Sequence, residues 1–188
     1  WSSDVCSSDL RQAFGSRIRI KRLMKKKMHI LIISDTHRYH TPLAGILDDE
    51  GPFDMLIHCG DLEGEEVAIE RLTGPECACV MVPGNNDFFS TLPRERTLTL
   101  LGRNIWITHG HNYYVSMDHS IIKSEAAARG ADIVMFGHTH KPLVDLSGPV
   151  IAVNPGSLTY PRQNGRRPSY IIMDIEENLS PRFEIKYL

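Results

Sequence analysis

Short apolar runs rich in β-branched residues alternate with polar segments along most of this chain. Three such runs occur in the first half, at 29–34, 55–59 and 79–82. Two segments of helical composition separate them, at 43–49 and 65–72. This alternation is typical of β-α-β units, which place parallel strands in one sheet.

Antiparallel pairing is expected further along the chain. The runs at 97–101 and 104–108 flank Gly102 and Arg103, which predicts a hairpin. A helix is predicted over Met117–Arg129, with Ile121 and Ala128 on its apolar face and a cap at Gly130. A buried strand at 132–136 follows, and four more runs then predict antiparallel strands, at 142–146, 150–154, 169–176 and 182–188. The pattern therefore predicts an α/β protein in which two mixed sheets pack face to face with helices outside.

Composition agrees with an ordinary folded domain. The chain has 188 residues, of which 41% are hydrophobic and 23% charged, and this balance excludes fibrous and disordered classes. Its longest apolar stretches have the length of strands, far below the roughly 18 residues that span a bilayer. We therefore expect no membrane-spanning segment and no membrane partner.

Residues 1–27 differ from the rest. They contain eight Lys and Arg against two Asp, lack the apolar region of a secretory signal, and include VCSSDL, which resembles a translated sequencing adapter. We interpret them as a non-native or disordered basic leader, with a basic arm for nucleic acid or anionic lipid as the alternative. The domain is expected to comprise residues 28–188.

The charge and cysteine content of residues 28–188 narrow the range of functions. Thirteen Lys and Arg face 21 Asp and Glu there, and an acidic domain disfavours stable nucleic-acid binding. The three cysteines, Cys59, Cys77 and Cys79, form no disulfide framework and no thiolate zinc motif. We therefore expect a reducing, cytoplasmic location.

Five apolar runs each end in polar residues of the types that bind metals. These clusters are Asp35–His37, Gly60–Asp61, Gly84–Asp87, His109–His111 and Gly137–His140. A single His or Asp at a strand end is more often a turn or surface residue, so the repetition carries the argument. Because ligands of α/β sheets collect outside the carboxyl ends of strands, we expect the five clusters to converge on one site.

The ordered set Asp-x-His, Gly-Asp, Gly-Asn-x-Asp, His-Gly-His and Gly-His-Thr-His resembles the calcineurin-like metallophosphoesterase superfamily, and within it the YfcE-like phosphodiesterase branch. The resemblance covers nearly all of residues 28–188, including the Asn-Pro-Gly-Ser turn at 154–157. It implies a four-layer α/β/β/α sandwich. It also implies two metal sites, with Asp61 bridging them: one formed by Asp35, His37 and His140, the other by Asn85, His109 and His138.

This resemblance implies two divalent metal ions and a bridging hydroxide as nucleophile. Carboxylate and amide oxygens mixed with imidazoles suit Mn²⁺ first, with Ni²⁺, Fe²⁺ or Zn²⁺ as alternatives. Asp87 is expected to orient a ligand imidazole, or else to be a plain turn residue. Asn86 stands where a larger part of the superfamily has a catalytic His, so either His111 or a metal-bound water would be the general acid, or the enzyme would prefer substrates with good leaving groups. Asn86 and Arg38 are assigned to substrate binding.

The sequence therefore predicts a metal-dependent phosphodiesterase that hydrolyses a small phosphodiester. A protein-interaction scaffold on the same fold is one alternative, and a phosphomonoesterase or nuclease is another. Completeness of the metal set disfavours the scaffold, and the acidic domain disfavours a processive nuclease. Whether the chain forms a homo-oligomer is left open.

Overall fold

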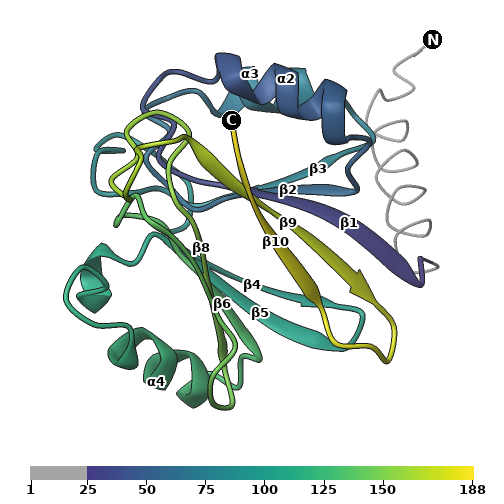
Figure 1. Cartoon of the computed structure of the whole chain (residues 1–188), viewed down its shortest axis with the longest axis vertical. Coiled ribbons are helices and arrows are strands. Elements are labelled where there is room, and N and C mark those ends of the chain that lie inside the picture. Colours follow the sequence, from purple (N-terminus) through teal and green to yellow (C-terminus); the bar gives the residue numbers. More distant parts are fainter. Residues whose placement is uncertain (1–24) are drawn as a thin grey trace, which may run out of the picture.

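The computed structural model describes residues 25–188, which form two five-stranded sheets packed face to face (Figure 1). The first sheet has the order β10 (Arg182–Tyr187), β9 (Ser169–Glu176), β1 (Lys27–Ile33), β2 (Met55–His58) and β3 (Ala78–Met81). The second has the order β4 (Glu95–Leu100), β5 (Arg103–Thr108), β6 (Ile133–Met135), β8 (Ile151–Pro155) and β7 (Pro142–Asp145). Both sheets are mixed, as predicted.

Helices cover the outer faces of both sheets. Figure 1 shows α2 (Thr41–Glu50) and α3 (Glu66–Thr73) outside the first sheet, and α4 (Ser120–Ala128) outside the second. The short 3-10 helix η1 (His111–Tyr113) precedes α4. The predicted four-layer α/β/β/α sandwich is therefore confirmed.

Alternating side chains of β1 explain why its apolar run is continuous. Ile30 and Ile32 are fully buried in the core between the sheets, whereas Leu31 and Ile33 are fully buried in the cluster that contains residues of α2 and α3. A strand covered on both faces needs apolar residues at every position. The core of the molecule is thus the contact between the two sheets, and each helix layer adds a smaller cluster outside.

The direction of the strands determines at which edge of each sheet the polar clusters lie. β1, β2 and β3 are parallel, and so are β5, β6 and β8, while β4, β7, β9 and β10 pair antiparallel. The last four strands form two hairpins in different sheets, because β9 returns to pair with β1. Each sheet therefore has parallel strands whose carboxyl ends share an edge.

The predicted β4–β5 hairpin is confirmed, but its turn lies one residue earlier than expected. Leu101 and Gly102 both have positive φ, 47° and 81°, and Leu100 pairs with Arg103. Two successive residues with positive φ form the turn whose twist matches antiparallel strands. Arg103 therefore belongs to β5 rather than to the turn.

The predicted helix over 117–129 is shorter, and its apolar face was wrong. It spans Ser120–Ala128, with Ile122 and Ala126 buried against the second sheet, whereas Ile121 is 45% exposed. Ile122 and Ala126 are spaced i,i+4 and so share one helix face. Gly130 is in the left-handed region at the end of this helix, as predicted.

The predicted leader lies outside the described residues except for 25–27, of which Lys27 begins β1. Within residues 25–188, no helix combines the length and apolar character needed to cross a membrane.

Candidate metal centre

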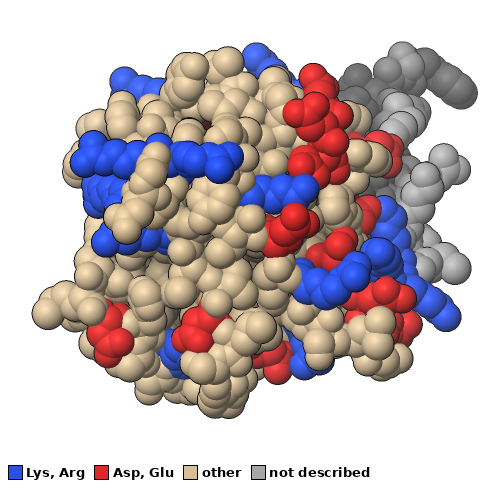
Figure 2. All heavy atoms as spheres, viewed as in Figure 1, with Lys and Arg blue, Asp and Glu red and all other residues tan. Residues whose placement is uncertain are grey.

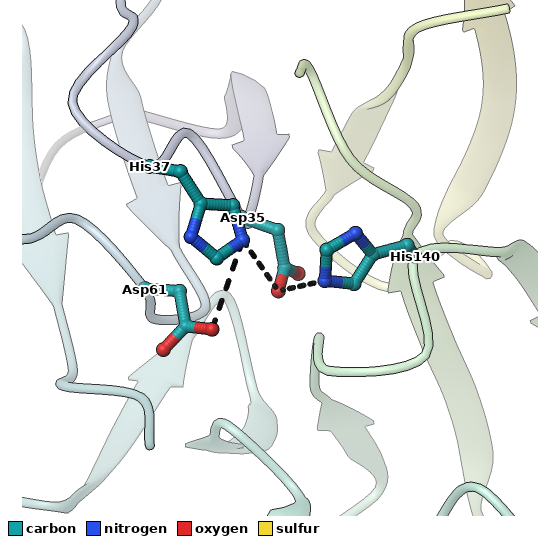
Figure 3. Close-up of side chains that lie close together, drawn as sticks. All are labelled: Asp35, His37, Asp61 and His140. Atoms are coloured by element: carbon teal, nitrogen blue, oxygen red, sulfur yellow. Dashed lines mark ion pairs between the residues drawn. The ribbon is translucent and has the colours of Figure 1, made fainter. Parts of the chain in front are cut away.

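Polar loops from both sheets meet at the carboxyl ends of the parallel strands. Four residues from these loops, Asp35, His37, Asp61 and His140, each offer a ligand atom, and the four atoms all lie within 4.8 Å of one another. Figure 3 shows them pointing toward a common centre, with Asp35 between the two imidazoles. The predicted first metal set and the predicted bridging Asp61 are therefore together in space.

Short distances connect these four side chains. The Asp35 Oδ1 atom lies 3.1 Å from His140 Nε2 and 4.0 Å from His37 Nε2. His37 Nε2 also lies 3.8 Å from Asp61 Oδ2. Two carboxylates and two imidazole nitrogens thus converge without a protein cation among them, which is the arrangement that a divalent cation neutralises.

The predicted second metal set lies beside the first. The Asn85 Oδ1 atom is 3.2 Å from His109 Nε2 and 2.9 Å from His138 Nδ1. His109 Nε2 is also 3.6 Å from Asp61 Oδ2, so Asp61 adjoins both groups. The structure therefore brings all seven predicted ligand residues into one cluster.

Backbone carbonyls orient two of the imidazoles. His109 Nδ1 donates to the Cys59 carbonyl oxygen at 2.7 Å, and His140 Nδ1 donates to the Tyr160 carbonyl oxygen at 2.7 Å. Because a carbonyl only accepts, each neutral ring carries its proton on Nδ1. The Nε2 lone pairs of both rings are thereby directed at the cluster, as metal ligands require.

Strained backbone accompanies this cluster. Five of its seven residues have positive φ although none is glycine: Asp35, His37, Asp61, His138 and His140, with φ between 44° and 67°. Such conformations cost free energy and concentrate at functional sites. The fold therefore tolerates strain to place these side chains.

Among the partners that residues 25–188 offer, two buried atoms of the cluster have none for a hydrogen bond, namely Asp35 Oδ1 and His37 Nε2. Burial opposes ionisation of Asp35, yet His140 and His109, when they carry a proton toward it, lower its pKa to about 2; a bound cation would supply the same positive charge where these rings are neutral. A buried anion and an unpartnered imidazole nitrogen fit a bound cation. The oxygen and nitrogen donors suit Mn²⁺, Fe²⁺, Ni²⁺ or Zn²⁺.

Asp61 is held by the loop after β3. A Cβ atom at Gly84 would lie 2.1 Å from Asp61 Oδ1, so only glycine allows this approach. Asn86 donates to the same carboxylate twice, from its backbone N to Oδ1 at 2.8 Å and from its Nδ2 to Oδ2 at 2.7 Å. Asn86, predicted to bind substrate, therefore makes its observed contacts with Asp61.

The structure corrects the predicted contact of Asp87. Its carboxylate accepts hydrogen bonds from the backbone amides of Leu62, Glu63 and Gly84 and, among the described residues, from no imidazole. Asp87 therefore ties the loop after β2 to the loop after β3, a positioning contact that the sequence did not indicate.

Glu63 makes the contact that was predicted for Asp87. Its Oε1 atom lies 2.8 Å from His37 Nδ1, which directs Nε2 of that ring at the cluster. The nearness of Glu63 to Asp61 in the sequence was a weak signal, since acidic residues are common in loops.

His111 and Arg38 lie at the border of the cluster. The ring centroid of His111 lies 5.4 Å from that of His109 and 6.2 Å from that of His138. Burial, together with the neighbouring His109, lowers the pKa of His111. The Arg38 side chain is 72% exposed, and its Nε is 3.4 Å from Glu63 Oε2.

A cleft of about 160 Å³ opens over the cluster, and two of its lining residues, Tyr160 and Arg162, were not predicted. They follow the 154–157 turn, to which the sequence assigned no chemistry. Figure 2 shows basic side chains over the region where Figure 1 places the segment between β8 and β9. That segment carries Arg162, Arg166 and Arg167, all exposed, so the acidic domain is locally basic beside the cleft.

Comparisons with known proteins agree with this geometry. Residues 28–178 match the model of the calcineurin-like phosphoesterase superfamily domain. The probable metallophosphoesterase YsnB of Bacillus subtilis is 34% identical over 154 residues, which cover 80% of this chain and 86% of YsnB. The phosphodiesterase YfcE of Escherichia coli is 29% identical over 114 residues, which cover 56% of this chain and 57% of YfcE.

Solved structures share the fold. A predicted phosphoesterase from Streptococcus pneumoniae superimposes with a TM-score of 0.71 at 26% identity, covering 87% of this chain and 90% of that one. Vps29 of Entamoeba histolytica, crystallised with Zn²⁺, has a TM-score of 0.68 at 21% identity, covering 85% and 99%; at this identity the likeness concerns the fold alone. Together with the family match and the Asp and His cluster, a candidate metal centre, these findings show that the chain belongs to the calcineurin-like phosphoesterase superfamily.

Proposed function

We propose that this protein is a metal-dependent phosphodiesterase that hydrolyses a small phosphodiester. The observation that carries the proposal is the convergence of seven oxygen and nitrogen donors, with Asp61 adjoining both groups. A single Zn²⁺ ion takes four ligands, fewer than the seven donors present here. A second ion beside the first accounts for the additional donors.

Asp35, His37 and His140 would hold one ion, Asn85, His109 and His138 the other, and Asp61 both. When bound, such ions polarise phosphoryl oxygens and activate water for attack on phosphorus. We place Mn²⁺ first, with Ni²⁺, Fe²⁺ and Zn²⁺ as alternatives, because the donor set contains no thiolate.

Side chains of the protein would position the Asp61 carboxylate and neutralise negative charge on the phosphate. Asn86 fixes both oxygens of Asp61, so that carboxylate cannot rotate as charge develops on the substrate. Arg162 lines the cleft and offers a guanidinium to a phosphate oxygen. Such fixed charges stabilise a transition state without reorganising during the reaction.

An alkoxide leaving group needs a proton donor. His111 lies beside the second group, with its ring centroid 5.4 Å from that of His109, and burial lowers its pKa. A lowered pKa reduces the fraction of His111 able to donate a proton, so either a metal-bound water supplies that proton or the enzyme prefers esters whose leaving group needs none. A p-nitrophenolate leaving group needs no proton and should react well.

Hydrolysis of bis-p-nitrophenyl phosphate and of p-nitrophenyl phosphate by the purified full chain tests the proposal. With Mn²⁺ we expect faster cleavage of the diester, little activity after chelation, and a loss of at least about 100-fold in Asp61→Asn. Asp49→Asn removes an exposed carboxylate of α2 and should retain activity.

Other outcomes point to the alternatives. Faster cleavage of the monoester would identify a phosphomonoesterase on the same centre. No turnover with Mn²⁺, Ni²⁺, Fe²⁺ or Zn²⁺, in a folded protein that binds the metal, would favour the protein-interaction scaffold.

A further inference from the structure

We call the seven candidate ligand residues the metal cluster, and the cleft that opens over them the metal cleft. A second hollow, larger than this cleft, lies beside it. It has a volume of about 470 Å³, and its lining includes Arg38, Glu63, Val67, Asn86, Phe88 and Phe89. We call it the Phe88–Phe89 groove. Phe88 is 81% exposed and Phe89 98% exposed. Two adjacent, nearly fully exposed rings leave apolar surface in water, which is uncommon away from binding sites.

The groove adjoins the metal cleft. Asn86 lines both of them, and Asn86 is also the residue that holds Asp61. On the other side, Arg38 of the groove directly follows His37 of the cluster. A molecule whose phosphate lay at the cluster would therefore pass Asn86 to reach the groove.

The loop that carries the two rings is anchored. Asp87, the residue before Phe88, is bound through its carboxylate to the amides of Leu62 and Gly84 at 3.2 and 2.7 Å. Its carbonyl oxygen also accepts from the Ser90 amide at 3.2 Å. The rings are thus exposed on a segment whose base is held by hydrogen bonds.

We propose that the Phe88–Phe89 groove binds an aromatic substituent of the phosphodiester, an aryl or nucleobase ring, while the phosphate lies at the metal cluster. This inference rests on the proposed function and names the substrate class of that site. The volume is that of a small-molecule site rather than of a protein interface. Exposed phenyl rings bind flat aromatic groups by stacking, whatever the identity of the ring.

Arg38 completes the groove. Its guanidinium is exposed and lies 3.4 Å from Glu63, which in turn orients His37. From this place it can stack on an aromatic ring or contact a phosphate oxygen. The groove therefore combines apolar faces with the Arg38 guanidinium and with the carboxylates of Glu63, Glu66 and Asp87. Of these, Glu63 is paired with Arg38 and Asp87 with backbone amides.

Binding of non-hydrolysable phosphonates tests the inference. Calorimetry would measure the affinity of methyl-, benzyl- and cyclohexylmethylphosphonate for the full chain loaded with Mn²⁺. Methylphosphonate reports on the metal cluster alone, and benzylphosphonate adds a ring able to enter the groove. We expect benzylphosphonate to bind about tenfold more tightly than methylphosphonate, the factor typical of one stacked ring.

The variant Phe88→Ala/Phe89→Ala should lose this preference and bind methylphosphonate as the unmodified chain does. Leu179→Ala, at an exposed apolar residue outside the groove, should retain the preference. Equal affinities for benzyl- and methylphosphonate in the unmodified chain would overturn the groove while leaving the proposed function intact. So would a preference that survives in the double variant, or an equal gain with cyclohexylmethylphosphonate. Failure of all three to bind would overturn the groove proposal, and the hydrolysis of bis-p-nitrophenyl phosphate would still decide the proposed function separately.

Discussion

His58 gives a quantitative prediction about stability because it is buried in a single protonation state. Its ring lies at the end of β2 with no exposed surface. The Gly60 amide donates to Nδ1 at 3.2 Å, so Nδ1 carries no proton and Nε2–H donates to Thr36 Oγ1 at 3.1 Å. A second ring proton would face the Gly60 N–H with no acceptor. The folded protein therefore excludes the charged imidazole.

The magnitude follows from the pKa of this group. Burial is the main reason that the pKa of His58 falls from 6.5 to about 4. Between these values the unfolded chain binds a proton that the folded chain does not, so stability falls as the pH decreases. The stability contribution is complete above pH 6.5 and lost below about pH 4. At 1.36 kcal/mol per pH unit the loss is about 3 kcal/mol.

Urea unfolding followed by circular dichroism, in the presence of a chelator, would measure this effect. The variant His58→Asn keeps an acceptor for the Gly60 amide but does not titrate. The free-energy difference between the unmodified chain and the variant should decrease by about 3 kcal/mol from pH 7.5 to pH 4. A difference that stays constant over this range would refute the argument that His58 is buried neutral.

Further predictions concern the loops around the metal cluster. Gly84→Ala should abolish Mn²⁺ binding measured by calorimetry, because a Cβ atom would lie 2.1 Å from Asp61 Oδ1; unchanged affinity would show that the loop can move away. Glu63→Ala should weaken Mn²⁺ binding about tenfold, because His37 Nδ1 loses its acceptor; no change in the same titration would remove Glu63 from the site. Asp87→Asn should lower the free energy of unfolding in urea by about 2 kcal/mol, through weakened hydrogen bonds to backbone amides. An unchanged free energy of unfolding would contradict the conclusion that Asp87 ties the loop after β2 to the loop after β3.

The convergence of the polar clusters could be predicted because each cluster follows a strand, and strand ends are visible in a sequence; the choice of the seven candidate ligand residues came from the resemblance to the family. The period and length of the apolar runs indicated the strands, and parallel strands deliver their carboxyl ends to one edge. Asp35 and His138, about a hundred residues apart in sequence, meet for this reason, and the Asp35 carboxylate accepts from the His138 amide at 3.2 Å.

Side-chain partners within the loops were not predictable in the same way. Glu63 rather than Asp87 contacts a candidate ligand imidazole, and Asp87 instead binds backbone amides. This difference depends on the path of two loops relative to each other, which no periodic pattern encodes. The buried face of α4 depended on the difference between Ile121 and Ile122, a rotation of one residue that a short helix leaves ambiguous. Exposure of Phe88 and Phe89 is likewise a property of the folded surface.

The most direct test of the metal-dependent phosphodiesterase follows metal and activity in the same samples. The chain would be treated with a chelator, Mn²⁺ restored in steps, and both bound Mn²⁺ and the rate of bis-p-nitrophenyl phosphate hydrolysis measured. The account predicts that the rate rises at least about 100-fold as the metal binds, and that it saturates when two ions are bound per chain. A hydrolysis rate that does not depend on bound Mn²⁺ would contradict the account. So would a folded chain that holds two ions and shows no hydrolysis.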